Sequence, residues 1–166
     1  TSYPTKVGYP APEMKGDILK MWRDVTAAND VALYAHHSGV WDNEAVAHHP
    51  EWARVNEKGE RSAEKTSVFG GYVDGLLIPQ LLEMANEYGL DGAWIDGECW
   101  AVQIDYSDMA KKAWHEKTGL EAPLPDEDGY EEYKEFNREG FKKYVGHYLT
   151  EVKKKAPEFQ IASNWL

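Results

Sequence analysis

Two acidic residues follow directly after a short apolar segment in the middle of the chain. Residues 89–96 indicate a helix end, a tight turn and a short buried strand, with Asp96 at its tip and Glu98 two residues on. In α/β folds the chemistry takes place beyond the carboxyl ends of the strands. A carboxylate there can act as a nucleophile, or two can act as general acid and base. Asp96 and Glu98 are therefore candidate catalytic residues.

The closeness of the two acids in sequence leaves their roles open. Retaining glycosidases hold their two carboxyl groups about 5–5.5 Å apart and inverting ones about 6.5–9.5 Å apart, and a spacing of two residues guarantees neither. Asp96 could instead cap the following turn or pair with a neighbouring strand. We favour catalysis, because a carboxylate at the inner end of a barrel strand has few structural duties. Glu98 falls in the loop, and its role stays undecided.

Alternation of side chains sorts the residues of three predicted strands, at 31–36, 93–96 and 159–164, onto two faces. The face expected under helices carries Leu33, Ala35, Ala93, Ile95 and Ile161. The opposite face carries Tyr34, His36, Trp94, Asp96, Ala162 and Asn164. Three polar members of this second set, His36, Asp96 and Asn164, fall near the carboxyl ends of their strands. Together they indicate a polar pocket.

Adjacent histidines offer an alternative, a metal site. His36, His37, His48 and His49 supply imidazoles, and Asp96 could join them as a ligand. Neighbours on a strand point to opposite faces, so at most one of His36 and His37 reaches the pocket. Neither pair has the i, i+4 spacing of ligands on a helix, and no cysteine helps. We therefore expect no metal and no cofactor.

The elements that position these residues alternate between helices and strands. Helices are predicted over residues 14–28, 74–88, 107–118 and 130–155, with Pro79 requiring a later start or a kink in the second. This order predicts an α/β fold with a parallel sheet and right-handed crossovers. Three strands make a poor open sheet, but they make a good arc of a (β/α)8 TIM barrel, which takes about 250 residues. We expect residues 1–166 to form one partial barrel domain of a larger catalytic domain, with a long loop at 37–72 and an acidic loop at 120–128 as insertions.

The composition favours some classes of binding partner and disfavours others. The formal net charge is −11, so a nucleic-acid partner is disfavoured, and no apolar run approaches the roughly 18 residues of a membrane span. The start of the chain lacks the pattern of a signal peptide. The single cysteine, Cys99, excludes an intrachain disulfide, lacks an adjacent basic partner for nucleophilic chemistry, and leaves the compartment open. Seven tryptophans and ten tyrosines favour a carbohydrate ligand, although each one alone could be core.

Several segments resemble one group of enzymes. The segments are residues 48–52 (His-His-Pro-Glu-Trp), a Gly59 turn, a helix from Tyr72 that carries Glu83, and residues 88–97. Over residues 31–98 the chain resembles bacterial (β/α)8-barrel glycoside hydrolases, the α-L-fucosidase-like enzymes and related glycosidases. The resemblance implies a retaining mechanism with Asp96 as nucleophile.

The same resemblance implies that His36 contacts the sugar and that Trp52 lines the pocket or supports its loop. The chain departs from the fucosidase pattern over residues 98–100, so the acid/base is either Glu98 or a residue outside this chain. The candidates for binding an oligosaccharide substrate are Tyr34, His36, His37, Trp52, Trp94, Trp100 and Asn164. The leading hypothesis is a glycoside hydrolase. The alternatives are a carbohydrate-binding barrel without catalysis and a metal-dependent hydrolase.

Overall fold

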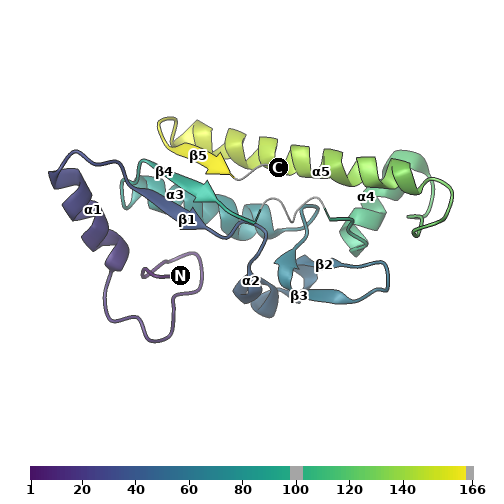
Figure 1. Ribbon diagram of the computed structural model, residues 1–166, viewed down its shortest axis with the longest axis horizontal. Helices are drawn as coiled ribbons and strands as arrows, with labels where there is room; N and C mark the ends of the chain where they lie inside the picture. The colour runs from purple at the N-terminus through teal and green to yellow at the C-terminus, as the bar shows by residue number, and fades with distance from the viewer. Residues whose placement is uncertain (98–102, 164–166) are drawn as a thin grey trace.

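Three parallel strands run side by side through the molecule (Figure 1). The computed structural model describes residues 1–97 and 103–163. The strands lie in the order β1-β4-β5, and both pairings are parallel. The chain is therefore a mixed α/β chain with a small parallel sheet, as predicted. The bounds are β1 (Tyr34–His37), β4 (Gly92–Ile95) and β5 (Gln160–Ser163).

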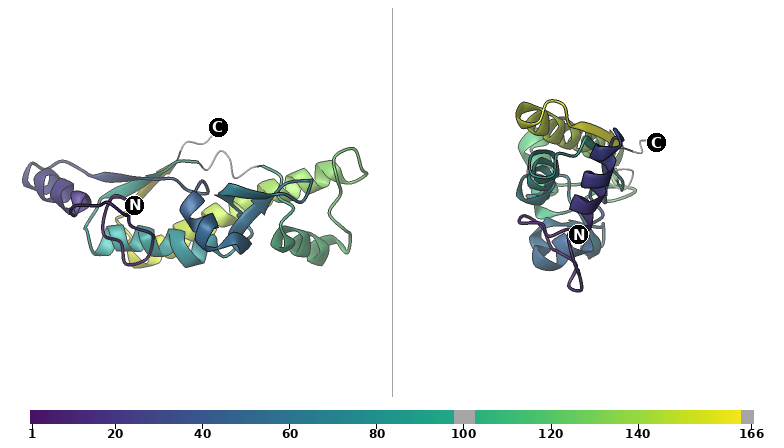
Figure 2. Two further views of the ribbon diagram at one scale, coloured as in Figure 1. Left: turned by 90° about the horizontal axis from the view of Figure 1, so that it is seen from below. Right: turned by 90° about the vertical axis from the view of Figure 1, so that its left-hand side faces the viewer.

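Two helices, α3 (Ile78–Asn86) and α5 (Tyr130–Lys155), cover one face of this sheet (Figure 2). Ala93 and Ile95 of the central strand are fully buried there, in one core with side chains from both helices. On the opposite face Trp94 is 47% exposed. The alternation predicted for the central strand is therefore observed, and it leaves one face of the sheet open.

Local signals set the ends of two other helices. The Asp17 carboxylate accepts the Lys20 N–H, so α1 (Ile18–Ala28) begins at residue 18 and not at residue 14. The Ser107 hydroxyl likewise caps α4 (Asp108–Thr118) by accepting the Ala110 N–H. Gly119 ends α4 in the left-handed conformation, with φ of 74°.

Residues 37–72 hold several short elements instead of the one long loop that the sequence predicts. A hairpin forms between β2 (Ala53–Val55) and β3 (Arg61–Thr66). Before it come α2 (Asn43–His48) and the 3-10 turn η1 (Pro50–Trp52). α2, η1 and β2 are too short to repeat an apolar spacing, and the six residues of β3 (Arg-Ser-Ala-Glu-Lys-Thr) lack the alternating apolar residues that identify a strand in sequence. Residues 120–128, between α4 and α5, contain no helix or strand.

A change of helix type accommodates Pro79. The helix predicted over residues 74–88 is in fact two segments, the π-helix η2 (Val73–Leu77) followed directly by α3. Pro79 is the second residue of α3, a position in the first turn of a helix where the missing backbone N–H costs little. Of the two alternatives for Pro79, a later start or a kink, the α-helix shows the later start, at Ile78, although the π-helix precedes it.

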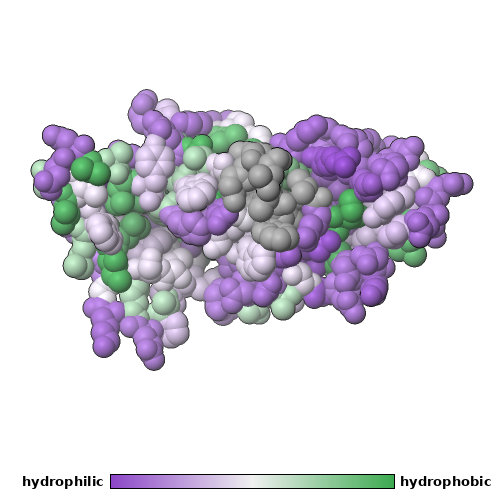
Figure 3. All heavy atoms as spheres, viewed as in Figure 1, coloured by the Kyte–Doolittle hydropathy of each residue, from purple (hydrophilic) through white to green (hydrophobic). Residues whose placement is uncertain are grey.

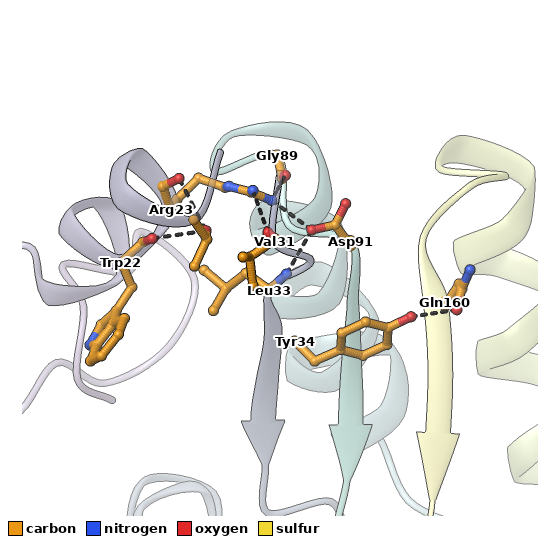
Figure 4. Close-up of polar contacts among 9 residues, drawn as sticks. Trp22, Arg23, Val31, Leu33, Tyr34, Gly89, Asp91 and Gln160 are labelled. Atoms are coloured by element: carbon orange, nitrogen blue, oxygen red, sulfur yellow. Dashed lines mark hydrogen bonds and ion pairs between the residues drawn. The ribbon is translucent and has the colours of Figure 1, made fainter. Parts of the chain in front are cut away.

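Arg23 ties α1 to the amino-terminal ends of the strands (Figure 4). Its guanidinium donates to Asp91 Oδ2 at 2.7 Å and to the carbonyls of Gly89 and Val31 at 3.2 and 3.3 Å. Asp91 Oδ2 also accepts the Leu33 N–H at 2.7 Å, and this bond together with Arg23 lowers the pKa of the Asp91 carboxyl. Since α1 has no buried residue, polar contacts rather than deep burial hold it.

Helix α1 carries several exposed apolar side chains. Figure 3 shows hydrophobic residues gathered at the left-hand end of the molecule, where α1 lies, and mostly hydrophilic ones at the right-hand end. Among the described residues, no helix is long and apolar enough to cross a membrane. The exposed apolar side chains of α1 are Ile18, Met21, Trp22 and Val25.

Gly92 lies beneath the ring of Tyr34. Tyr34 reaches across β4, and its hydroxyl donates to the Gln160 amide oxygen on β5 (Figure 4). A Cβ at position 92 would collide with the Tyr34 ring and with the Gln160 carbonyl oxygen. We therefore expect Gly92→Ala to lower the free energy of unfolding by about 1–3 kcal/mol, the usual range for overpacking. Urea denaturation measures this loss.

The control is Gly146→Ala, within α5. No atom lies within 4 Å of a Cβ built at Gly146, so alanine has room there and favours the helix. Stability should rise by roughly 0.5–1 kcal/mol. A Gly92→Ala protein as stable as the wild type would contradict the packing described for Tyr34.

Candidate active site

His36 and Asp96 meet on the open face of the sheet. His36 belongs to β1, and Asp96 follows the last residue of β4. The His36 Nε2 atom lies 3.2 Å from Asp96 Oδ2, and the two side chains are 59% and 42% exposed. A carboxylate and an imidazole thus stand in contact at the carboxyl end of the central strand and remain open to solvent.

The backbone fixes the Asp96 carboxylate from the other side. The Gly97 N–H donates to Asp96 Oδ1 at 2.8 Å, and the Asp96 N–H donates to the His37 carbonyl at 2.7 Å. Gly97 has φ of 78°, a left-handed conformation that favours glycine. The main chain therefore holds Oδ1, while Oδ2 faces His36.

Two aromatic residues accompany this pair on the same face. Trp94 lies opposite His36 in the register of β1 and β4, and the two rings meet edge to face at 5.9 Å. Tyr34 is 41% exposed and lies two residues before His36, with its hydroxyl on Gln160. These exposed ring faces can stack on a sugar, because each combines an apolar face with a polar handle.

Other sequence candidates lie away from this pair. The His37 ring contacts Gln80 of α3, on the helix side of the sheet. The Trp52 ring lies against Gly71 and Gly75, close to the start of η2, and stacks on His49 at 3.8 Å. The structure therefore brings His36, Asp96, Trp94 and Tyr34 together and separates His37 and Trp52 from them. Glu98, Cys99, Trp100 and Asn164 lie outside the described residues.

His48 and His49 pack against aromatic rings. His48 stacks on Tyr9 with centroids 4.1 Å apart, and His49 Nδ1 lies 3.1 Å from Glu51 Oε1. Within residues 1–97 and 103–163, no group of three or more His, Cys, Asp or Glu side chains could hold a metal ion.

A hollow of about 590 Å³ runs along the free edge of β1, next to this pair. Its volume falls in the range of about 300–1,000 Å³ that is usual for small-molecule sites. Trp22 falls at helical spacing with other apolar residues on one face of the helix predicted over residues 14–28, and the sequence indicates no role for Tyr9 and Trp41. The only signal for Trp22 is its place on an apolar stripe, which normally indicates core. Residues around the hollow include Tyr9, Trp22, Tyr34, His36, Trp41 and Gln80.

Comparisons with known proteins find a structural likeness. No family model matches the chain, and no curated protein matches it. The solved structure of alpha-L-fucosidase isoenzyme 2 from Paenibacillus thiaminolyticus is similar, with a TM-score of 0.78 and 18% sequence identity. The alignment covers 99% of this chain and 25% of that chain. At this identity the likeness shows the fold alone: the chain is similar in architecture to about a quarter of that chain.

Proposed function

We propose that the chain carries part of the active site of a glycoside hydrolase that cleaves O-glycosidic bonds and resembles α-L-fucosidases. One observation carries this proposal: Asp96 contacts His36 at the carboxyl end of the central parallel strand, on a face that the helices leave open. The likeness to a fucosidase fold supports it. Residues 1–166 would then be an arc of a (β/α)8 barrel, in which residues 37–72 and 120–128 are insertions.

The proposed mechanism is retaining, with Asp96 as nucleophile. A carboxylate oxygen of Asp96 attacks the anomeric carbon, and the glycosidic bond breaks as a second carboxyl group gives its proton to the leaving oxygen. The same group then takes a proton from water, which attacks the anomeric carbon and releases Asp96. The second carboxyl group is Glu98 or a residue outside this chain.

The surrounding residues have binding roles in this proposal. His36 contacts Asp96 through Nε2 and would contact a sugar hydroxyl through Nδ1, and Trp94 and Tyr34 offer exposed ring faces. Trp100 and Asn164 remain candidates for the same pocket. His37 and Trp52 would support the site through their neighbours, because their rings contact protein groups.

The test is hydrolysis of aryl glycosides by the intact protein. Release of nitrophenolate from an aryl α-L-fucoside, compared with other aryl glycosides, shows whether the protein is a glycosidase and which sugar it prefers. Proton NMR of the first-formed sugar should show the configuration of the substrate. A product of inverted configuration would exclude the retaining mechanism. The absence of hydrolysis of every aryl glycoside tested would contradict the proposed glycosidase activity.

A second candidate function is sugar binding without catalysis. The observation that favours it is the exposure of two ring faces, 47% for Trp94 and 41% for Tyr34, on one face of the sheet. Quenching of tryptophan fluorescence by an oligosaccharide that the intact protein never hydrolyses would support it. Turnover of the same oligosaccharide would exclude it.

A further inference from the structure

The half-buried ring of His37 lies between β1 and α3, with both of its nitrogens engaged. The Gly39 N–H donates to His37 Nδ1 at 3.0 Å, and His37 Nε2 lies 3.0 Å from Gln80 Oε1. A backbone N–H is always a donor, so Nδ1 carries a lone pair and Nε2 carries the proton. Burial also lowers the pKa of His37, which favours this neutral tautomer.

The turn at residues 37–39, which His37 stabilises, contacts the backbone of Asp96 and Gly97. The Gly39 carbonyl accepts the Tyr72 hydroxyl at 2.7 Å, which holds the turn from the side of η2. A Cβ on Gly97 would collide with the Ser38 carbonyl, so these two backbones are in close contact. The His37 carbonyl itself accepts the Asp96 N–H at 2.7 Å. Any movement of residues 37–39 is therefore transmitted to Asp96.

The N-terminal segment, residues 5–8, packs against Gln80, the hydrogen-bond partner of His37. Gln80 is only 4% exposed, and its side-chain amide lies against Gly8, where any Cβ would collide with it. The buried Glu83 carboxylate holds that segment by accepting the Thr5 hydroxyl at 2.5 Å and the Lys6 N–H at 2.7 Å. Gln80 is thus kept in place to accept from His37.

We infer that His37, held as the neutral Nε2–H tautomer by Gln80, is a positioning residue for Asp96. The inference rests on the proposed function, because it concerns the nucleophile of that reaction. An imidazolium has no lone pair, so a protonated His37 would lose the Gly39 N–H and release the turn. The charged or titratable groups that act on His37 are Asp42, which favours protonation, and His36, which opposes it.

The test places a carboxylate beside His37 in the Gln80→Glu variant. An opposite charge at hydrogen-bond distance favours the imidazolium by about 1–3 pH units. On the acid side of the pH profile of kcat (the acid limb), the pH at which kcat falls to half should therefore rise by at least about one unit. KM at high pH should stay within about twofold of the wild type. An unchanged profile would overturn the inference.

Two further variants separate positioning from a general structural effect. Gln80→Leu removes the acceptor without adding charge, so kcat should fall about 10- to 100-fold near neutral pH. The limb should not move up, because the Gln80 hydrogen bond raises the pKa of His37 and its loss lowers that pKa. Asn86→Asp adds a carboxylate at the exposed end of the same helix without touching His37 or Gln80, so the limb should stay in place. A shifted limb in Asn86→Asp would show that the effect is not specific to His37.

An NMR measurement keeps the inference testable if the protein hydrolyses no glycoside. Nitrogen-15 shifts of the His37 ring should show the Nε2–H tautomer, and in Gln80→Glu the Asp96 and Gly97 amide signals should follow the His37 titration. The opposite tautomer, or amide signals that ignore the titration, would overturn the inference. Failure of hydrolysis alone would overturn only the proposed function.

Discussion

The Asp96→Gly variant of the intact protein is expected to lower kcat on aryl glycosides by at least about 10³-fold, because it removes the group that attacks the anomeric carbon. Asp96 follows the last residue of β4, and its side chain contacts His36. The Gly97 N–H donates to its Oδ1 atom at 2.8 Å. No other described carboxylate is in contact with His36 on the open face. Initial rates of nitrophenolate release measure the loss.

Sodium azide should restore part of the activity of Asp96→Gly. The azide anion fits the space of the lost carboxylate and forms a bond to the anomeric carbon as the aryl oxygen leaves. The product is then a glycosyl azide of inverted configuration, which NMR identifies. Activity of Asp96→Gly within a few-fold of the wild type would remove Asp96 as nucleophile.

Asp91→Asn is the matched control, at the opposite end of the same strand. Asp91 precedes β4 and binds Arg23 at 2.7 Å, away from the open end of the sheet (Figure 4). Loss of its charge should weaken the attachment of α1. It should leave kcat within about twofold of the wild type, because Asp91 lies at the other end of the strand from the proposed reaction and would make no contact with the substrate. A large fall of kcat in Asp91→Asn would mean that the assay reports folding rather than chemistry.

The Asp105→Ala variant is expected to lose about 3–5 kcal/mol of stability, more than the Gly92→Ala variant. Asp105 is 2% exposed, and its carboxylate accepts the hydroxyls of Ser67 at 2.5 Å and Ser107 at 2.9 Å. It also accepts the N–H groups of Val55 at 3.1 Å and Ser107 at 2.8 Å. Alanine would leave all of these donors buried without their acceptor.

The position of Asp105 explains the size of the expected effect. It joins the β2 hairpin, the amino terminus of α4 and, through its backbone N–H on Asn137 Oδ1 at 2.9 Å, helix α5. Asp108→Ala is the control, because that side chain is 88% exposed and should cost no more than about 0.5 kcal/mol. Urea denaturation compares the two variants. Equal losses would show that the buried carboxylate has no special role.

Much of the fold could be predicted from the sequence because its larger elements repeat their patterns. The helix over residues 130–155 has the observed bounds, and the parallel pairing follows from the alternation of helices and strands. The short elements between β1 and η2 could not be predicted in this way. Their stability comes from contacts distant in sequence, such as the Thr66 N–H on the Val40 carbonyl at 2.9 Å.

The site could be predicted from the sequence only in part. Alternation in a strand correctly placed His36 and Trp94 on one face, because period two is a property of the backbone. The aromatic content was a weaker guide to a ligand, since Tyr72, Tyr133 and Tyr148 are all fully buried in the core. The roles of Gln80 and Gly8 depend on a contact between segments more than 70 residues apart, which no local pattern reveals.

The contact of Tyr34 with Gly92 has a consequence for how this sequence can evolve. The tyrosine ring occupies the space of the missing side chain, so position 92 is not free to change alone. A larger residue at 92 requires that the ring at 34 be lost and that the Gln160 carbonyl shift, and the link from Tyr34 to Gln160 on the third strand is then lost as well. Homologous chains should therefore exchange these residues together, and a glycine at 92 should accompany an aromatic residue at 34.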